Sequence, residues 1–253
     1  MDCVLMAGGR PAPDDPLFPI TKGKPKALLP IAGRPIIDYV LQALMEAESV
    51  DDIVIVGLES GSIGDRGSSL KFVADQGNMI ANGMAGLECL KERRPDTRHV
   101  LFASSDIPAA TGAMIDDVVN MCRPLDRSAY YIMVDKIILE QFFPGSNRTY
   151  VRLRNMQVAG ADIVIADARL ADSNTQLFQD MSVARKKPWK MAGIAGLTTI
   201  LALLLHRLTL QGIEQRATWV LGQPVSVALT QYPQLAMDVD KPEQLSLFRD
   251  LLS

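Results

Sequence analysis

Glycines and carboxylates stand in this sequence where strands of a parallel sheet are predicted to end or where a helix is predicted to begin. In chain order, these residues are Gly8, Gly9, Asp106, Asp238 and Asp240. Ligands of open α/β sheets bind outside the carboxyl ends of the strands. Glycine lets backbone N–H groups approach a phosphate closely, and carboxylate oxygens are the ligands that a hard cation such as Mg²⁺ prefers.

A lysine cluster follows the two glycines in an acidic loop broken by prolines. Lys22, Lys24 and Lys26 could balance the charge of a polyphosphate beside a bound cation. Each feature also has an ordinary explanation, because a glycine pair can be a simple turn and a lysine run can be a solvated loop. Asp106 could be a turn former and Asp240 a helix N-cap. The order in which the features occur together favours a magnesium-phosphate site.

Composition narrows the class of protein. The chain has 253 residues, 48% of them apolar, and a formal net charge of −3, so a soluble globular α/β protein is expected and a nucleic-acid partner is not. The three cysteines are odd in number and set among apolar residues, which predicts reduced core thiols. His99 and His206 have no histidine or cysteine partner at metal-ligand spacing, so any metal is expected to be a hard one held by oxygens.

The N-terminus lacks the basic flank and long apolar centre of a signal peptide, which predicts a cytoplasmic protein. The longest apolar stretch, residues 191–205, is shorter than the ~20 residues that a membrane-spanning helix needs. We therefore predict a buried helix there, with the lining of a hydrophobic pocket as the alternative, and no membrane partner.

Apolar runs at 52–57, 70–75 and 99–106 predict strands that are buried on both faces. Pro35 fits the first turn of an amphipathic helix over residues 36–47, and Thr111 is a candidate N-cap for the helix after it. The expected fold class is α/β, a three-layer αβα sandwich with a mostly parallel central sheet.

The second half is less regular. Residues 149–154 and 161–167 predict strands, and residues 173–222 are expected to be mostly helical. A last strand over 225–230 and a closing helix over 240–252 follow. The sequence predicts a single domain, 1–253, whose second half carries the variable, substrate-facing insertions.

Two nucleotide-binding motifs are absent. The glycine segment "MAGGRPAP" is not G-x-G-x-x-G, and no G-K-[ST] of a Walker A loop occurs. Three other segments, "LMAGGR…PKALLPIAGRPIIDYVLQAL", "SSDIP" and "DVDKPEQL", resemble motifs of the nucleotidyltransferases with a GT-A-like, Rossmann-like fold. The similarity is greatest to the group of the molybdenum-cofactor guanylyltransferase (MobA-like NTP transferases) and the sugar-phosphate cytidylyl- and guanylyltransferases.

The resemblance implies that about 1–125 binds a nucleotide, and that about 126–253 binds an acceptor and supplies the closing metal ligand. The nucleotide would be bound by Leu5, Ala7, Gly8, Gly9, Arg10, Lys26, Asn82 and Asp106. The metal, Mg²⁺ with Mn²⁺ as an alternative, would be held by Asp106 and Asp240, with Asp238 the second choice. Lys26, Asp106 and Asp240 would be the catalytic residues. The opening loop would be a flexible cover over the triphosphate, in which Lys24 and Lys26 supply charge.

The resemblance also implies the reaction. A nucleoside monophosphate would pass from an NTP, CTP or GTP, to a phosphorylated sugar, polyol or cofactor precursor, with release of pyrophosphate. Because the attacking phosphate oxygen is already ionised, positioning and charge neutralisation would supply most of the catalysis. The family's Gly-Gly-Asn segment is Ala159-Gly160-Ala161-Asp162 in this chain. Arg148, Asp162 and Lys187 are the first candidates for acceptor binding, in a monomer or homodimer.

Two other functions stay open at this stage. One is a glycosyltransferase that uses a sugar nucleotide on the same fold, suggested by the "DVD" of residues 238–240. The other is a nucleotide-binding or regulatory protein without turnover, suggested by the altered residues 159–162 and the long opening loop. Pyrophosphate release would distinguish a nucleotidyltransferase from both.

Overall fold

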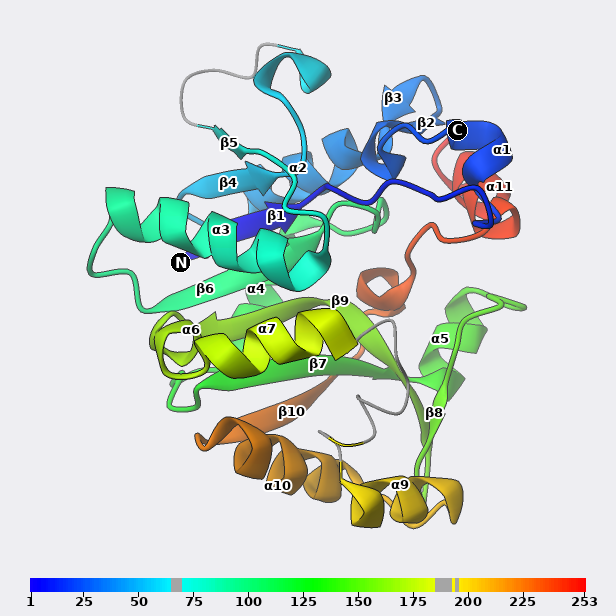
Figure 1. The fold of residues 1–253 in the computed structure, drawn as a ribbon. Helices are drawn as coiled ribbons and strands as arrows, with labels where there is room; N and C mark the ends of the chain where they lie inside the picture. Colours follow the sequence, from blue (N-terminus) through cyan, green and yellow to red (C-terminus); the bar gives the residue numbers. More distant parts are fainter. Residues whose placement is uncertain (65–69, 185–192, 194–195) are drawn as a thin grey trace.

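The computed structural model describes residues 1–64, 70–184, 193 and 196–253 (Figure 1). The elements are β1 (Asp2–Met6), α1 (Phe18–Thr21), η1 (Lys26–Leu28), β2 (Pro30–Ile31), β3 (Arg34–Pro35), α2 (Ile36–Glu46), β4 (Ile53–Val56), η2 (Ser60–Ile63), β5 (Lys71–Val73), α3 (Met79–Arg93), β6 (His99–Ser104), α4 (Gly112–Met121), β7 (Ala129–Asp135), α5 (Lys136–Phe142), β8 (Val151–Arg152), β9 (Gln157–Asp167), α6 (Arg169–Ser173), α7 (Thr175–Ala184), α9 (Leu197–Leu204), α10 (Leu210–Leu221), β10 (Val225–Thr230), η3 (Pro233–Ala236) and α11 (Pro242–Leu251).

The main sheet is mostly parallel, as predicted. Its strands run in the order β10-β7-β9-β6-β1-β4-β5, and β8 pairs with β9. β1 is parallel to both β4 and β6, and β10 is parallel to β7, whereas β9 runs antiparallel between β6 and β7. The carboxyl ends of β1, β5, β6 and β7 therefore meet at one edge of the sheet.

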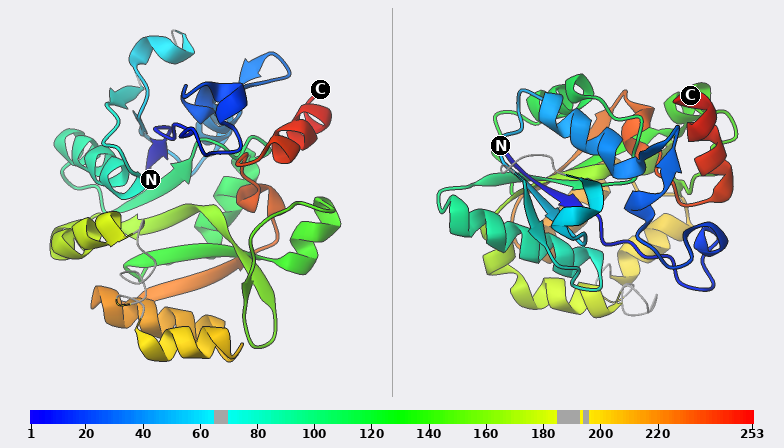
Figure 2. Two further views of the ribbon diagram at one scale, coloured as in Figure 1. Left: turned by 45° about the vertical axis from the view of Figure 1, so that its right-hand side comes forward. Right: turned by 90° about the horizontal axis from the view of Figure 1, so that it is seen from above.

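Helices cover both faces of this sheet (Figures 1 and 2). The central strand β1 shows why its sequence is continuously apolar: Cys3 and Leu5 lie in the core on one face, and Val4 lies in the core on the other. α2 and α4 cover the first face, and α3 covers the second with α7 beside it. The predicted three-layer sandwich is confirmed.

The predicted local signals around α2 and α4 are confirmed. α2 begins directly after Pro35 and buries the residues that recur at helical spacing, among them Ile37, Leu41 and Leu44. Thr111 caps α4, because its hydroxyl accepts a hydrogen bond from the N–H of Met114. Thus α2 begins directly after its proline, and α4 begins at its threonine cap, as the sequence signals predict.

The apolar stretch at 191–205 was predicted to form a buried helix, and this prediction is wrong for its described part. In α9, Leu201 is 48% exposed and Leu204 is 68% exposed, and Leu205 just after it is 61% exposed. A helix is buried only where another element covers its apolar side chains, so its hydrophobicity alone does not predict burial. No helix among the described residues is long and apolar enough to span a membrane.

All three cysteines are free thiols, as predicted. Cys3 and Cys122 are buried, whereas Cys89 is only half-buried, so the prediction of core thiols holds for two of the three. Burial raises the pKa of the Cys122 thiol to about 11, which keeps it protonated and unreactive at neutral pH.

Candidate active site

A cavity of about 450 Å³ lies at the carboxyl edge of the sheet. Its walls come from the segments after β1, β5 and β6, from the start of α3, and from the chain between η3 and α11. Segments from the beginning, middle and end of the sequence therefore meet there. This is the position at which open α/β sheets bind ligands.

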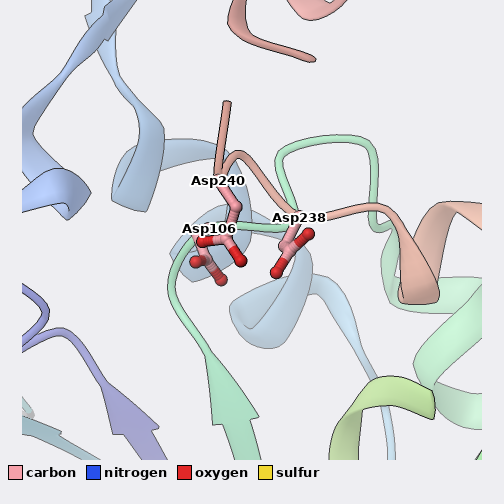
Figure 3. A group of neighbouring side chains, drawn as sticks. All are labelled: Asp106, Asp238 and Asp240. Carbon is pink, nitrogen blue, oxygen red and sulfur yellow. The ribbon is translucent and has the colours of Figure 1, made fainter. Parts of the chain in front are cut away.

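The carboxylates of Asp106, Asp238 and Asp240 lie close together (Figure 3), and all three residues line this cavity. One oxygen from each lies within 4.8 Å of the others. Asp106 follows β6, where Ser104 donates a hydrogen bond of 2.5 Å to its Oδ1. The N–H of Val239, between the other two aspartates, donates to the backbone carbonyl of Asp106 at 3.0 Å. This backbone hydrogen bond joins two carboxylate segments that lie far apart in the sequence.

Lys26 reaches into the same cluster. Its Nζ lies 2.5 Å from Asp106 Oδ2 and also donates a hydrogen bond to Asp240 Oδ1. The backbone there is fixed, because the N–H of Lys26 donates to the carbonyl of Gly9 at 2.8 Å. Burial disfavours the ammonium ion, but Asp106 and Asp240 outweigh burial and raise the pKa of Lys26. Lys26 is therefore charged at neutral pH.

Arg148 is the second cation of the cluster. Its guanidinium donates to Asp162 Oδ2 at 2.8 Å, to the carbonyl of Gly160 at 3.2 Å, and to Asp238 Oδ1. Only 14% of the Arg148 side chain is exposed. Asp162, the last residue of the segment 159–162, thus faces an arginine. The predicted acceptor residues Arg148 and Asp162 are brought together, and Asp162 lines the cavity.

The cluster has more negative than positive charge. Asp106, Asp162, Asp238 and Asp240 face only Lys26 and Arg148 among the residues that the structure describes. Burial, followed by the charge of Asp106, raises the pKa of Asp238 to about 7.

Burial and the charges of the cluster also shift the pKa values of Asp162 and Asp240. Burial, followed by the charge of Asp238, raises the pKa of Asp162 well above its usual value. Burial also acts to raise the pKa of Asp240, but Lys26 outweighs burial and lowers it. Oxygen-only ligands with an excess of negative charge suit a divalent hard cation, so the residues fit Mg²⁺.

Gly8 lines the cavity and is closely packed against the segment after β5. A Cβ atom on Gly8 would lie 2.5 Å from Asp75 Oδ1 and 2.6 Å from Asn82 Nδ2, so alanine would displace these two hydrogen-bonded side chains. Asn82 holds the segment after β5, because its Nδ2 donates to Asp75 Oδ1 at 2.9 Å and its Oδ1 accepts from the N–H of Gln76 at 2.6 Å. Gly57 has a φ of +103°, and a Cβ atom there would lie 2.2 Å from the Cα of Gly8. The glycine turn is therefore closely packed against its neighbours.

Part of the opening loop is anchored. Leu17 is 1% exposed, and its N–H donates to Asp15 Oδ1 at 2.8 Å, so Asp15 stabilises a turn. Arg10 is exposed and lines the cavity, whereas Lys24 lies outside the cavity wall. The expected contribution of Lys24 to the charge at the triphosphate stays a prediction.

The remaining predicted site residues divide into two groups. Gly8, Gly9 and Asn82 line the cavity, whereas the side chains of Leu5 and Ala7 are buried in the core below it. Lys187, together with Lys186, Trp189 and Lys190, lies outside the described residues.

Sequence reasoning missed Asp75, Asn78, Met79 and Ser104, which also line the cavity. Asp75 ends a predicted strand, so the rule that singled out Asp106 could have found it.

A family model described as the MobA-like NTP transferase domain matches residues 3–173, which is more than half of the chain. The chain belongs to this family. The resemblance seen in the sequence is thereby confirmed, and the protein is a nucleotidyltransferase. No protein of curated function matches the sequence.

Solved structures agree with this assignment. A hypothetical transferase from Thermus thermophilus is 31% identical, with a TM-score of 0.82 over 96% of this chain and 98% of that one. The CMP:2-keto-3-deoxy-manno-octonic acid synthetase complexed with CTP has a TM-score of 0.58 and 11% identity over 100% and 97% of the two chains. The 2-C-methyl-D-erythritol 4-phosphate cytidylyltransferase from Thermus thermophilus has a TM-score of 0.55 and 15% identity over 99% and 98%. At these identities, the last two show a shared fold.

Proposed function

We propose that this MobA-like transferase catalyses the Mg²⁺-dependent transfer of a nucleoside monophosphate from CTP or GTP to a phosphorylated small molecule, with release of pyrophosphate. The observation that supports this proposal is the meeting of three carboxylates and Lys26 beside the Gly8-Gly9 turn in one cavity. Two of the structural neighbours are named for CTP or for a cytidylyl transfer to a sugar-alcohol phosphate.

The residues have distinct roles in this proposal. The turn at Gly8 and Gly9 admits the phosphates, and Arg10 and Lys26 supply positive charge to them. Asp106 and Asp240 would hold Mg²⁺, or Mn²⁺ as an alternative, with Asp238 beside them; when bound, the cation stabilises negative charge on the phosphate oxygens. Asp238 stays the third choice as a ligand; Arg148 contacts one of its oxygens, just as Lys26 contacts one oxygen each of Asp106 and Asp240.

The chemistry needs no base from the protein. An oxygen of the acceptor phosphate forms a bond to the α-phosphorus, and the bond from that phosphorus to the bridging oxygen of the β-phosphate breaks. The acceptor oxygen is already ionised, so the protein has to align it and to screen charge. Arg148 and Asp162 border the space on the acceptor side, where we place the phosphorylated substrate.

The test is pyrophosphate release with Mg²⁺, each of the common ribonucleoside triphosphates, and a panel of sugar, polyol and alcohol phosphates. We expect release with one nucleotide and one acceptor class, and a loss of about 10²–10³-fold in Asp106→Asn, because removal of one group that stabilises charge costs that much in comparable sites. Asp96→Asn is the matched control, since Asp96 is exposed near the amino end of β6. Nucleotide binding without release on any acceptor would contradict turnover.

A further inference from the structure

The ammonium of Lys26 lies among the same oxygens that would hold a metal. Asp106 and Asp240 each offer a ligand atom to the proposed cation site, and Lys26 Nζ contacts a carboxylate oxygen of both. Magnesium requires its oxygen ligands at about 2.0–2.1 Å with near-ideal octahedral geometry. An ammonium that contacts both carboxylates therefore competes with a metal for the same oxygens.

The backbone of Lys26 is held by the hydrogen bond from its N–H to the carbonyl of Gly9, so only its side chain needs to move. The side chain is long and 15% exposed, and the cavity wall beside it is formed by Gly9 and Arg10. A flexible lysine stem can therefore turn its charge from the carboxylates toward a phosphate bound at the glycine turn.

We propose that Lys26 is an internal counter-ion that closes the divalent-metal site until a nucleoside triphosphate draws its ammonium away. The metal then enters together with the nucleotide or after it, and free metal does not occupy the site first. This order rests on the proposed function. It also gives Lys26 two positions, one on Asp106 and Asp240 and one on the phosphates.

The contacts of Arg148 determine which carboxylates become free when Lys26 moves. It holds Asp238 and Asp162 from the acceptor side, and no nucleotide phosphate is needed to explain its contacts. Departure of Lys26 therefore uncovers Asp106 and Asp240, while Asp238 keeps its arginine. Metal affinity in the absence of nucleotide should depend on Lys26 more than on any other described lysine.

The test is titration of the full chain with Mn²⁺ and no nucleotide, in which free Mn²⁺ is counted by electron paramagnetic resonance. We expect Lys26→Met to bind Mn²⁺ at least about tenfold more tightly than the parent, because removal of a neighbouring positive charge is worth at least that much at a site this buried. Lys24→Met is the matched control, because Lys24 belongs to the same loop and lies outside the cavity wall, and it should bind like the parent. The double variant Lys26→Met/Asp106→Asn should not show this gain in Mn²⁺ affinity, because Asp106 would be a ligand of the bound ion.

A second variant covers the case in which Lys26→Met does not fold. Lys26→Gln keeps a polar group of similar reach and removes only the charge, and it should also gain Mn²⁺ affinity, whereas Lys26→Arg should not. Equal or weaker Mn²⁺ binding by both neutral variants would overturn the proposal. The titration uses neither nucleotide nor acceptor, so its result is independent of whether pyrophosphate release is found.

Discussion

The loss of Arg148 should lower the free energy of unfolding by an amount that follows from its contacts. Its guanidinium donates to two carboxylates and one carbonyl, and its replacement by methionine leaves Asp162 and Asp238 without their cation. Breaking a fully buried ion pair costs about 3–5 kcal/mol. The side chains of Arg148 and Asp162 are 14% and 25% exposed, so solvent screens part of that cost and we expect about 3 kcal/mol.

The loss can be measured by thermal unfolding. For a domain of this size, a loss of about 1 kcal/mol lowers Tm by about 2–4 °C, so Arg148→Met should lower Tm by roughly 6–12 °C. Arg152→Met is the control, because Arg152 is exposed and makes no side-chain ion pair among the described residues. Its Tm should match that of the parent.

Two further measurements test the electrostatic cause. The double variant Arg148→Met/Asp162→Asn should regain much of the lost stability, because one unpaired charge is gone. The deficit should also be smaller at about pH 5 than at about pH 8, since protonation neutralises the orphaned carboxyl groups. A deficit that is unchanged by pH and by Asp162→Asn would refute the charge-balance reasoning and leave only lost packing.

Three other perturbations follow from the site. Gly57→Ala should destabilise the fold by about 3 kcal/mol or more in urea unfolding, because its Cβ would lie 2.2 Å from the Cα of Gly8 at a φ of +103°. Gly8→Ala should weaken nucleotide binding at least about tenfold by calorimetry, since the new methyl meets Asp75, whereas Gly61→Ala, which adds a methyl to an exposed position outside the cavity wall, should not. The folded protein binds the proton of Asp238 more tightly than the unfolded chain, because its pKa rises from 3.8 to about 7. Stability in EDTA should therefore fall, by at most about 4 kcal/mol, as pH rises from about 4 to about 7, and Asp238→Asn should flatten the curve; a curve that is equally steep in the variant would exclude Asp238 as the cause.

The first half of the fold was predictable because its signals are local. The strand that begins at Asp2 is apolar at every later position since both faces of β1 are covered, and α2 shows its buried face through spacing alone. The second half has weaker signals. β9 runs over Gln157–Asp167, longer than the predicted 161–167, and its register with β7 shifts between Tyr131 and Met133. A strand with a glycine and an irregular register shows little of the expected pattern.

The candidate site was predictable only for residues that stand in short sequence motifs. Asp106, Asp240 and Lys26 stand in recognisable motifs, and the structure brings the three together. The contact of Arg148 with Asp238 joins residues 90 positions apart, so no local pattern indicates it. The exposure of α9 could not be foreseen for the same reason, because it depends on what lies next to the helix and not on the helix itself.

The position of β9 has a consequence for how the chain can be divided. This strand, from the second half, is hydrogen-bonded on one side to β6 of the first half and on the other to β7. A fragment that ends near residue 125 would leave the long edge of β6 without a partner, and an open apolar edge invites aggregation. We therefore expect assembly of the sheet to wait for β9, and the two halves to fold as one cooperative unit.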